Sequence, residues 1–290
     1  MTSNEKTVTE NAVTENTAKK GTPIGIKIAG YIFAFVLSVC IVILATSIIV
    51  RSMLSTDALL SCIPTYYYSS LKADVQSQCE DYTLPTGIDP SVLSDVFSEE
   101  QVKKDVIFCI TNAAPGSAKL DTSEMEAHIL SNVEDFFVGQ GVEVDGAVSG
   151  DLDAYAKEIS DIYRRSVKLP GIDYITRIRT KFGQIMIYIL IVTLLLGLAC
   201  AILCLKLIPS IKRGFRYVTE AIGGAGLMMI ALPLIMLIDR FYEHLNIRPD
   251  YFADTIASYV RNGLIKFILT GVVMLVIYIV CSIVLFLKKK

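Results

Sequence analysis

A basic and an acidic residue, Arg216 and Glu220, stand where a long apolar stretch of the sequence begins, and they form the first pattern that could carry chemistry. Because they are four positions apart, a helix would place both side chains on one face, where they can form an ion pair. A carboxylate within a membrane helix is also typical of transport sites. The sequence favours an ion pair at the membrane boundary and leaves a transport site as the alternative.

The seven cysteines offer redox or metal chemistry. Cys62 and Cys79 lie in an acidic region and would form a disulfide if that region is outside the cell, but Cys109 makes the local count odd, so free thiols are an equal alternative. Cys200 and Cys204 are one helical turn apart in an apolar run. No histidine or second cysteine pair accompanies them in sequence, so we expect them to pack as small apolar residues.

No catalytic constellation is apparent elsewhere in the sequence. The two histidines, His128 and His244, are 116 positions apart, and neither has a metal-ligand pattern around it. Phosphate-binding loops, zinc-protease motifs, nucleophile elbows and dinucleotide-binding fingerprints are also missing. We therefore expect a protein that is not an enzyme and that holds neither a metal nor a cofactor.

Three consecutive tyrosines, Tyr66, Tyr67 and Tyr68, follow the first apolar segment closely. Tyrosine is enriched where a membrane meets water, so an aromatic belt at the outer interface is the favoured interpretation. A surface that binds a partner through its aromatic rings is the sharper alternative.

Four apolar segments, at 24–50, 182–205, 217–238 and 267–287, must position these residues. Each is long enough to cross a hydrocarbon core of about 30 Å as a helix. The second contains 24 residues without a formal charge, 14 of which are Ile, Leu, Val or Phe. The first continues past the usual length of a signal peptide, about 7–15 apolar residues. The sequence predicts an all-α membrane protein with four transmembrane helices and a helical extramembrane domain inserted between helices 1 and 2.

The third apolar segment carries small residues and a proline, namely Ala221, Gly223, Ala225, Gly226 and Pro233. Small residues let helices approach closely, so we expect this helix to pack tightly against its neighbours. A homo-oligomer of the chain is a further possible partner arrangement. The proline could instead interrupt the helix near mid-depth, as in transporters. Tight packing with a tolerated kink is the favoured interpretation.

The region 51–181 reads as an acidic bundle of helices. Between Ser52 and Lys181 it has 21 acidic and 11 basic residues. Asp89, Ser98 and Asp121 stand at expected helix starts, each followed by proline, a capping-box pattern or acidic residues. Because the large polar region is acidic, we expect no nucleic-acid partner.

The remaining segments set the expected topology. They are a disordered polar tail (1–23), a basic loop (206–216), a connection with an amphipathic helix (239–266) and a basic end (288–290). The amphipathic helix could lie on the membrane or lengthen the last span. Lys and Arg gather near the tail, the loop and the end, which predicts that both termini are cytoplasmic and that 51–181 is extracytoplasmic.

We expect a multi-pass protein of the cell membrane that contacts the lipid bilayer and uses its outward-facing domain to bind a protein partner or sense a ligand. An accessory subunit of a membrane complex would have these features. A small transporter or channel with a pathway around the third apolar segment is the alternative.

Overall fold

The computed structural model describes residues 24–113, 119–142, 144, 146–168, 172–207, 211–244 and 247–287. Within these ranges the regular structure is helical and there are no strands, so the predicted all-α class is confirmed. The tail at 1–23 and the basic end at 288–290 lie outside the described residues. The chain divides into two compact units, which are described separately.

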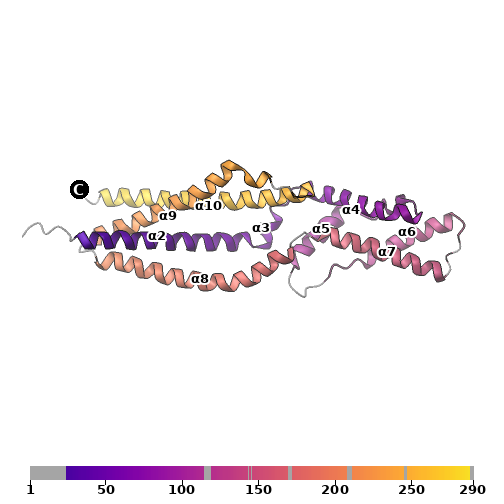
Figure 1. Cartoon of the computed structure of the whole chain (residues 1–290), viewed down its shortest axis with the longest axis horizontal. Helices are drawn as coiled ribbons and strands as arrows, with labels where there is room; N and C mark the ends of the chain where they lie inside the picture. The colour runs from indigo at the N-terminus through magenta and orange to yellow at the C-terminus, as the bar shows by residue number, and fades with distance from the viewer. Residues whose placement is uncertain are drawn as a thin grey trace, which may run out of the picture. The chain divides into compact units, whose positions relative to one another are not determined.

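Four long helices contribute to unit 1, which comprises the described residues of 24–48, 187–235 and 265–287. They are α2 (Ile24–Met53), α8 (Ile172–Leu207), α9 (Ile211–Asp239) and α10 (Asp250–Leu287) (Figure 1). Each contains a stretch that is long and apolar enough to cross a membrane. Length and composition thus indicate a multi-pass membrane protein with four candidate spans.

Each of these helices extends beyond the apolar segment from which it was predicted. The largest extension is in α10, where the amphipathic segment forms the first part of the helix. Of the two predicted alternatives, this segment therefore lengthens the last helix. Pro233 lies inside α9, which remains one helix from Ile211 to Asp239, so the alternative of a helix interrupted at the proline does not occur.

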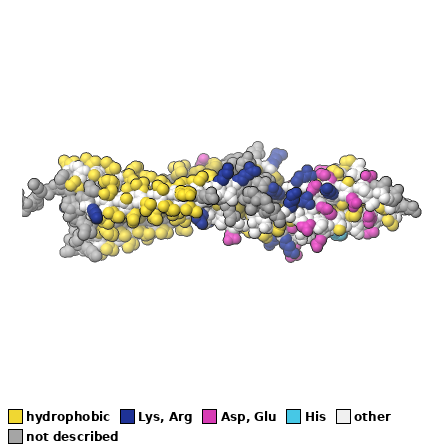
Figure 2. Space-filling view, turned by 90° about the horizontal axis from the view of Figure 1, so that it is seen from below, with side chains coloured by type: hydrophobic (Ala, Val, Ile, Leu, Met, Phe, Trp, Pro, Cys, Tyr) yellow, Lys and Arg dark blue, Asp and Glu magenta, His cyan; other side chains and the backbone are white. Residues whose placement is uncertain are grey.

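Unit 1 buries small and polar side chains and exposes large apolar ones. Ala34, Leu37, Cys200 and Ala221 form its buried cluster, and Ser38 is also buried. The exposed surface of its helices is instead rich in Ile, Leu and Val, which gives the nearly continuous apolar surface in Figure 2. This is the arrangement expected when lipid is the solvent.

Unit 2 comprises the described residues of 49–186 and 236–264. Its further helices are α3 (Thr56–Leu60), α4 (Tyr67–Thr83), η1 (Leu84–Thr86), η2 (Pro90–Leu93), α5 (Glu99–Thr111), α6 (Ser123–Gly139), α7 (Gly146–Val167) and η3 (Phe241–His244). The predicted helix starts occur close to their expected places. Ser98 accepts a hydrogen bond from the Gln101 backbone N–H, and Asp89 caps η2 through Ser91.

The core of unit 2 is made of large apolar side chains from α4, α5, α6 and α7. Val102 and Val106 on α5, Ile129 on α6 and Ile159 on α7 are fully buried in it. Charged side chains of both signs lie on the face of unit 2 that Figure 2 shows. This packing is typical of a helical domain whose solvent is water.

Candidate functional site

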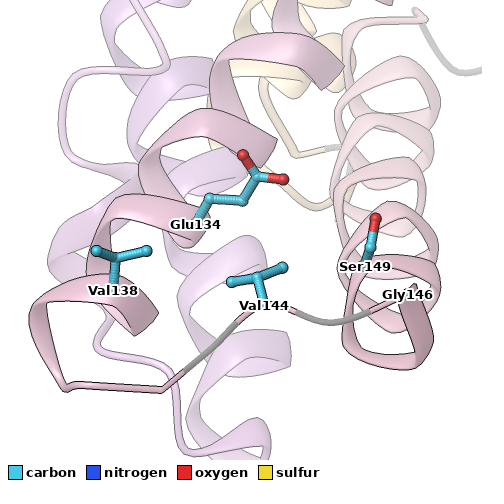
Figure 3. A pocket seen from close by; sticks show the side chains of 5 residues that line it. All are labelled: Glu134, Val138, Val144, Gly146 and Ser149. Atoms are coloured by element: carbon cyan, nitrogen blue, oxygen red, sulfur yellow. The ribbon is translucent and has the colours of Figure 1, made fainter.

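A concave surface of unit 2 lies between the end of α6 and the start of α7 (Figure 3). It has a volume of about 420 Å³ and is shallow, with most of it open to the surroundings. Its lining residues are Glu134, Val138, Val144, Gly146 and Ser149. We call it the α6–α7 hollow. It forms because α6 ends at Gly139 and the chain turns through Gly141, whose φ of 76° is readily adopted only by a residue without a side chain.

The hollow joins an apolar edge to a carboxylate. Val138, at its edge, is 64% exposed, and the nearby Val142 is 42% exposed. Figure 3 shows the Glu134 carboxylate extending from α6 across the opening. Glu134 is half-buried and makes no ion pair or side-chain hydrogen bond with the described part of the chain.

The sequence that carries the hollow is strongly acidic, and Arg164 of α7 pairs with one of its carboxylates, Glu126, near the start of α6. From 120 to 156 the sequence contains nine Asp and Glu residues and no Lys or Arg. On α6 this includes Glu134 and Asp135, and near its start the hydroxyl and backbone N–H of Ser123 hold the pKa of Asp121 below its usual range. Such a surface can bind a cation or a basic side chain that also carries apolar groups. The hollow shows no nucleophile and base in contact that would perform a reaction.

The three tyrosines predicted as a belt or a binding surface separate in the structure. Tyr67 is buried in the core, and burial raises the pKa of its hydroxyl. Tyr66 is exposed and hydrogen-bonds to Asp254 of α10, whereas Tyr68 lies 5.8 Å beneath the ammonium group of Lys103. They do not share one exposed surface, because consecutive residues on a helix point in different directions.

The first part of α10 packs against the elements that carry these tyrosines. The Tyr67 and Tyr251 rings meet edge to face with centroids 5.1 Å apart, and the Tyr251 hydroxyl donates to Asp74 at 2.9 Å. Farther along α10, the Tyr259 hydroxyl donates to the Met53 carbonyl oxygen at 2.9 Å. Residues near 250–264 therefore belong to unit 2, which the sequence pattern did not reveal.

Cys62 and Cys79 are free thiols in the structure, so the disulfide is not formed and the alternative of free cysteines describes this state. Cys79 lies in the core, where burial raises the pKa of its thiol to about 12. Cys62 accepts a hydrogen bond from Asn262 of α10 at 3.3 Å. The two thiols thus have different partners within unit 2.

A buried polar pair in unit 2 had no signal in the sequence. The Tyr163 hydroxyl on α7 donates to Asp105 on α5 at 2.5 Å, and Gln101 donates to the other carboxylate oxygen at 3.0 Å. Burial and the hydrogen bond to Asp105 raise the pKa of Tyr163. Both oxygens of Asp105 are hydrogen-bonded, so we assign the pair to the core rather than to a reactive site.

In unit 1, Arg216 donates to Glu220 at 2.9 Å, as the four-residue spacing predicts.

The predicted packing residues Ala221, Gly223, Ala225, Gly226 and Pro233 are all buried. A Cβ added to Gly223 would come within 2.8 Å of the Tyr278 ring, and one added to Gly226 would come within 3.0 Å of the Gly271 carbonyl oxygen. These glycines therefore let α9 and α10 approach closely.

The described residues contain no group of three or more His, Cys, Asp or Glu side chains that could hold a metal ion. His128 lies 3.6 Å from Asp95 on the surface of unit 2. Comparison with known protein families, characterised proteins and solved structures finds no match to this chain.

Proposed function

We propose that this chain is a non-catalytic membrane protein whose unit 2 stands outside the bilayer and binds a protein partner at the α6–α7 hollow. The proposal rests chiefly on one observation, the combination of the exposed Val138 with a Glu134 carboxylate that has no ion pair among the described residues, in a stretch of sequence, 120–156, that contains no Lys or Arg. Such a surface fits a basic segment that carries an aliphatic side chain. An accessory subunit of a membrane complex would work in this way.

We further propose that the termini are cytoplasmic, that the membrane is the cell membrane, and that the helical domain is extracytoplasmic and inserted mainly between α2 and α8. The distribution of Lys and Arg supports this orientation. Labelling with a membrane-impermeant thiol reagent on intact cells tests it. Because Cys62 and Cys79 are buried, a reporter cysteine is needed at an exposed position, and Gln140→Cys supplies one.

Gln140→Cys should be labelled on intact cells, whereas Arg213→Cys in the first turn of α9 should be labelled only after permeabilisation. The reverse pattern would contradict the orientation. The half-buried Cys109 could react with the reagent and give background labelling, so it is replaced by serine in both variants.

Photo-crosslinking tests partner binding. A photoreactive residue at Val138 should give a discrete crosslinked product in native membranes, and Glu134→Arg should weaken that product. The same residue at Lys104, which is exposed on α5, serves as the matched control. Equal products at both positions, or none at Val138, would count against the hollow as a binding site.

The transporter alternative would need Glu220 to face a pathway. Its carboxylate is paired with Arg216, and the neighbouring Gly223 and Gly226 pack closely against α10. Neither observation favours a pathway, so we retain the binding role as the proposal.

A further inference from the structure

Four exposed basic residues of unit 1 belong to the same end of its helices. They are Lys27 on α2, Lys206 near the end of α8, and Arg213 and Arg216 in the first turns of α9. We call these four residues the basic rim.

Contacts between the helices place the rim residues together. The Tyr31 and Tyr217 rings meet edge to face with centroids 5.0 Å apart, so the first turns of α2 lie beside the first turns of α9. Gly214 approaches the end of α8 so closely that an added Cβ would lie 2.7 Å from the Cys204 carbonyl oxygen. Lys27 and Arg213 are each four positions before one of the paired tyrosines, and Lys206 is two positions after Cys204.

The last helix ends on the same side. Gly223 contacts Tyr278, and Gly226 contacts Gly271, so α9 and α10 run in opposite directions. The end of α10 at Leu287 therefore lies toward the first turns of α9. All four helices of unit 1 consequently have one terminus at this end (Figure 1).

The rim has a strong excess of positive charge. Glu220 is the only acidic residue among the described residues of unit 1, and its carboxylate lies 2.9 Å from Arg216. Among the described residues of unit 1, the four rim cations therefore outnumber the one carboxylate. In a membrane helix bundle, such a group of cations attracts negatively charged headgroups.

An apolar surface begins directly beside the cations. Ile24, Ile28 and Ile32 on α2 are exposed, and so are the ring of Tyr31 and the side chain of Phe215 on α9. A ligand that fits this surface has an anionic head next to hydrocarbon chains. Free phosphate would use the cations alone and would leave the apolar surface uncovered.

We propose that the basic rim binds the headgroup of an anionic phospholipid. Arg216 supplies planar hydrogen-bond donors for the phosphate, and Lys27, Lys206 and Arg213 add charge around it. Glu220 competes with the phosphate for Arg216, so it limits the affinity of the site. This inference does not depend on the partner-binding role of unit 2.

Native mass spectrometry of the full chain in detergent tests the site by titration with phosphatidylglycerol, with phosphatidylcholine as the zwitterionic reference. R213Q/R216Q should weaken phosphatidylglycerol binding at least about tenfold, since each surface cation contributes about fivefold. K27Q/K206Q should weaken it similarly and leaves the Arg216–Glu220 pair intact, which guards against a folding defect. K103Q/K104Q removes two exposed cations from unit 2 and should change binding less than about twofold.

Glu220→Gln gives the test in the opposite direction, because it releases Arg216 and should tighten phosphatidylglycerol binding. Unchanged affinity in both rim variants would overturn the proposal, as would an equal loss in K103Q/K104Q. Displacement of the lipid by millimolar inorganic phosphate would also overturn it, because the site would then be a general anion site rather than a lipid site.

Discussion

Unit 1 and unit 2 are both built from helices, yet they bury opposite kinds of side chain. Unit 1 places Ala221, Ala225 and Ser38 inside and Ile or Leu outside, whereas unit 2 buries residues such as Ile129 and Tyr163 and exposes its charges. Lipid is as apolar as leucine, so burying leucine between membrane helices brings little gain and close backbone approach matters more. In water the apolar area removed from solvent dominates.

Helix α10 shows the contrast within one element. Its first part contributes Tyr251 to the core of unit 2, and its later part presents Gly271 to α9. The same helical geometry therefore serves two kinds of packing, and the side chain at each contact decides which kind applies.

The largest expected effect comes from filling a glycine contact in unit 1. In Gly271→Ala the new Cβ would lie 2.6 Å from Ile230 and 2.8 Å from the Gly226 carbonyl oxygen, and the latter is backbone that cannot easily move. We expect a loss of about 3 kcal/mol of stability. Hydrogen exchange should show reduced protection in α9 and α10 of unit 1, with α5 and α7 unchanged.

Gly25→Ala is the matched control, because nothing lies within 4 Å of the added Cβ. It should leave exchange in α9 and α10 unaffected. If both substitutions had the same effect, close packing would not distinguish unit 1 from unit 2.

The next effect is expected in the core of unit 2. Tyr163→Phe removes the donor to the buried Asp105 carboxylate, which should cost about 2 kcal/mol because hydrogen bonds to charged groups are strong. Chemical denaturation of the full chain, followed by hydrogen exchange in α5 and α7, measures the loss. Tyr82→Phe, at an exposed ring, should stay within about 0.5 kcal/mol of the unchanged chain. If Tyr163→Phe left the free energy of unfolding unchanged, the hydrogen bond between Tyr163 and Asp105 would not stabilise the core.

Alkaline pH should weaken unit 2 through Cys79. Its pKa is raised from 9.0 to about 12 by burial, so the unfolded state releases the proton first. The contribution of the protonated Cys79 thiol to the free energy of unfolding is fully present below about pH 9. It is lost as the pH rises toward about 12, with a slope of at most about 1.4 kcal/mol per pH unit. Denaturation between pH 8 and pH 10 should show this slope, and Cys79→Ala should reduce it. An identical slope in the variant would assign the alkaline sensitivity to other groups.

The smallest effect is expected where α10 meets α4. Tyr251→Phe keeps the ring contact with Tyr67 but removes the hydrogen bond to Asp74, at a cost of about 1 kcal/mol. Hydrogen exchange should rise at the start of α10 and remain unchanged near Gly271. Increased exchange along the whole of α10 would show that its two parts do not open separately.

The sequence by itself determined the features that depend on neighbours along the chain. Apolar length predicted the four candidate spans, residue spacing predicted the Arg216–Glu220 pair, and capping chemistry predicted the helix start at Ser98. These properties are local, because a helix is closed by hydrogen bonds between residues four apart.

Tertiary structure alone decided which segments meet. It placed the start of α10 against α4, buried Tyr67 while leaving Tyr66 exposed, and joined Asp105 to Tyr163 across 58 positions of sequence. It also formed the α6–α7 hollow and left Cys62 and Cys79 as free thiols. No local pattern encodes such contacts, because burial depends on which surfaces pack together and therefore on residues distant in the chain.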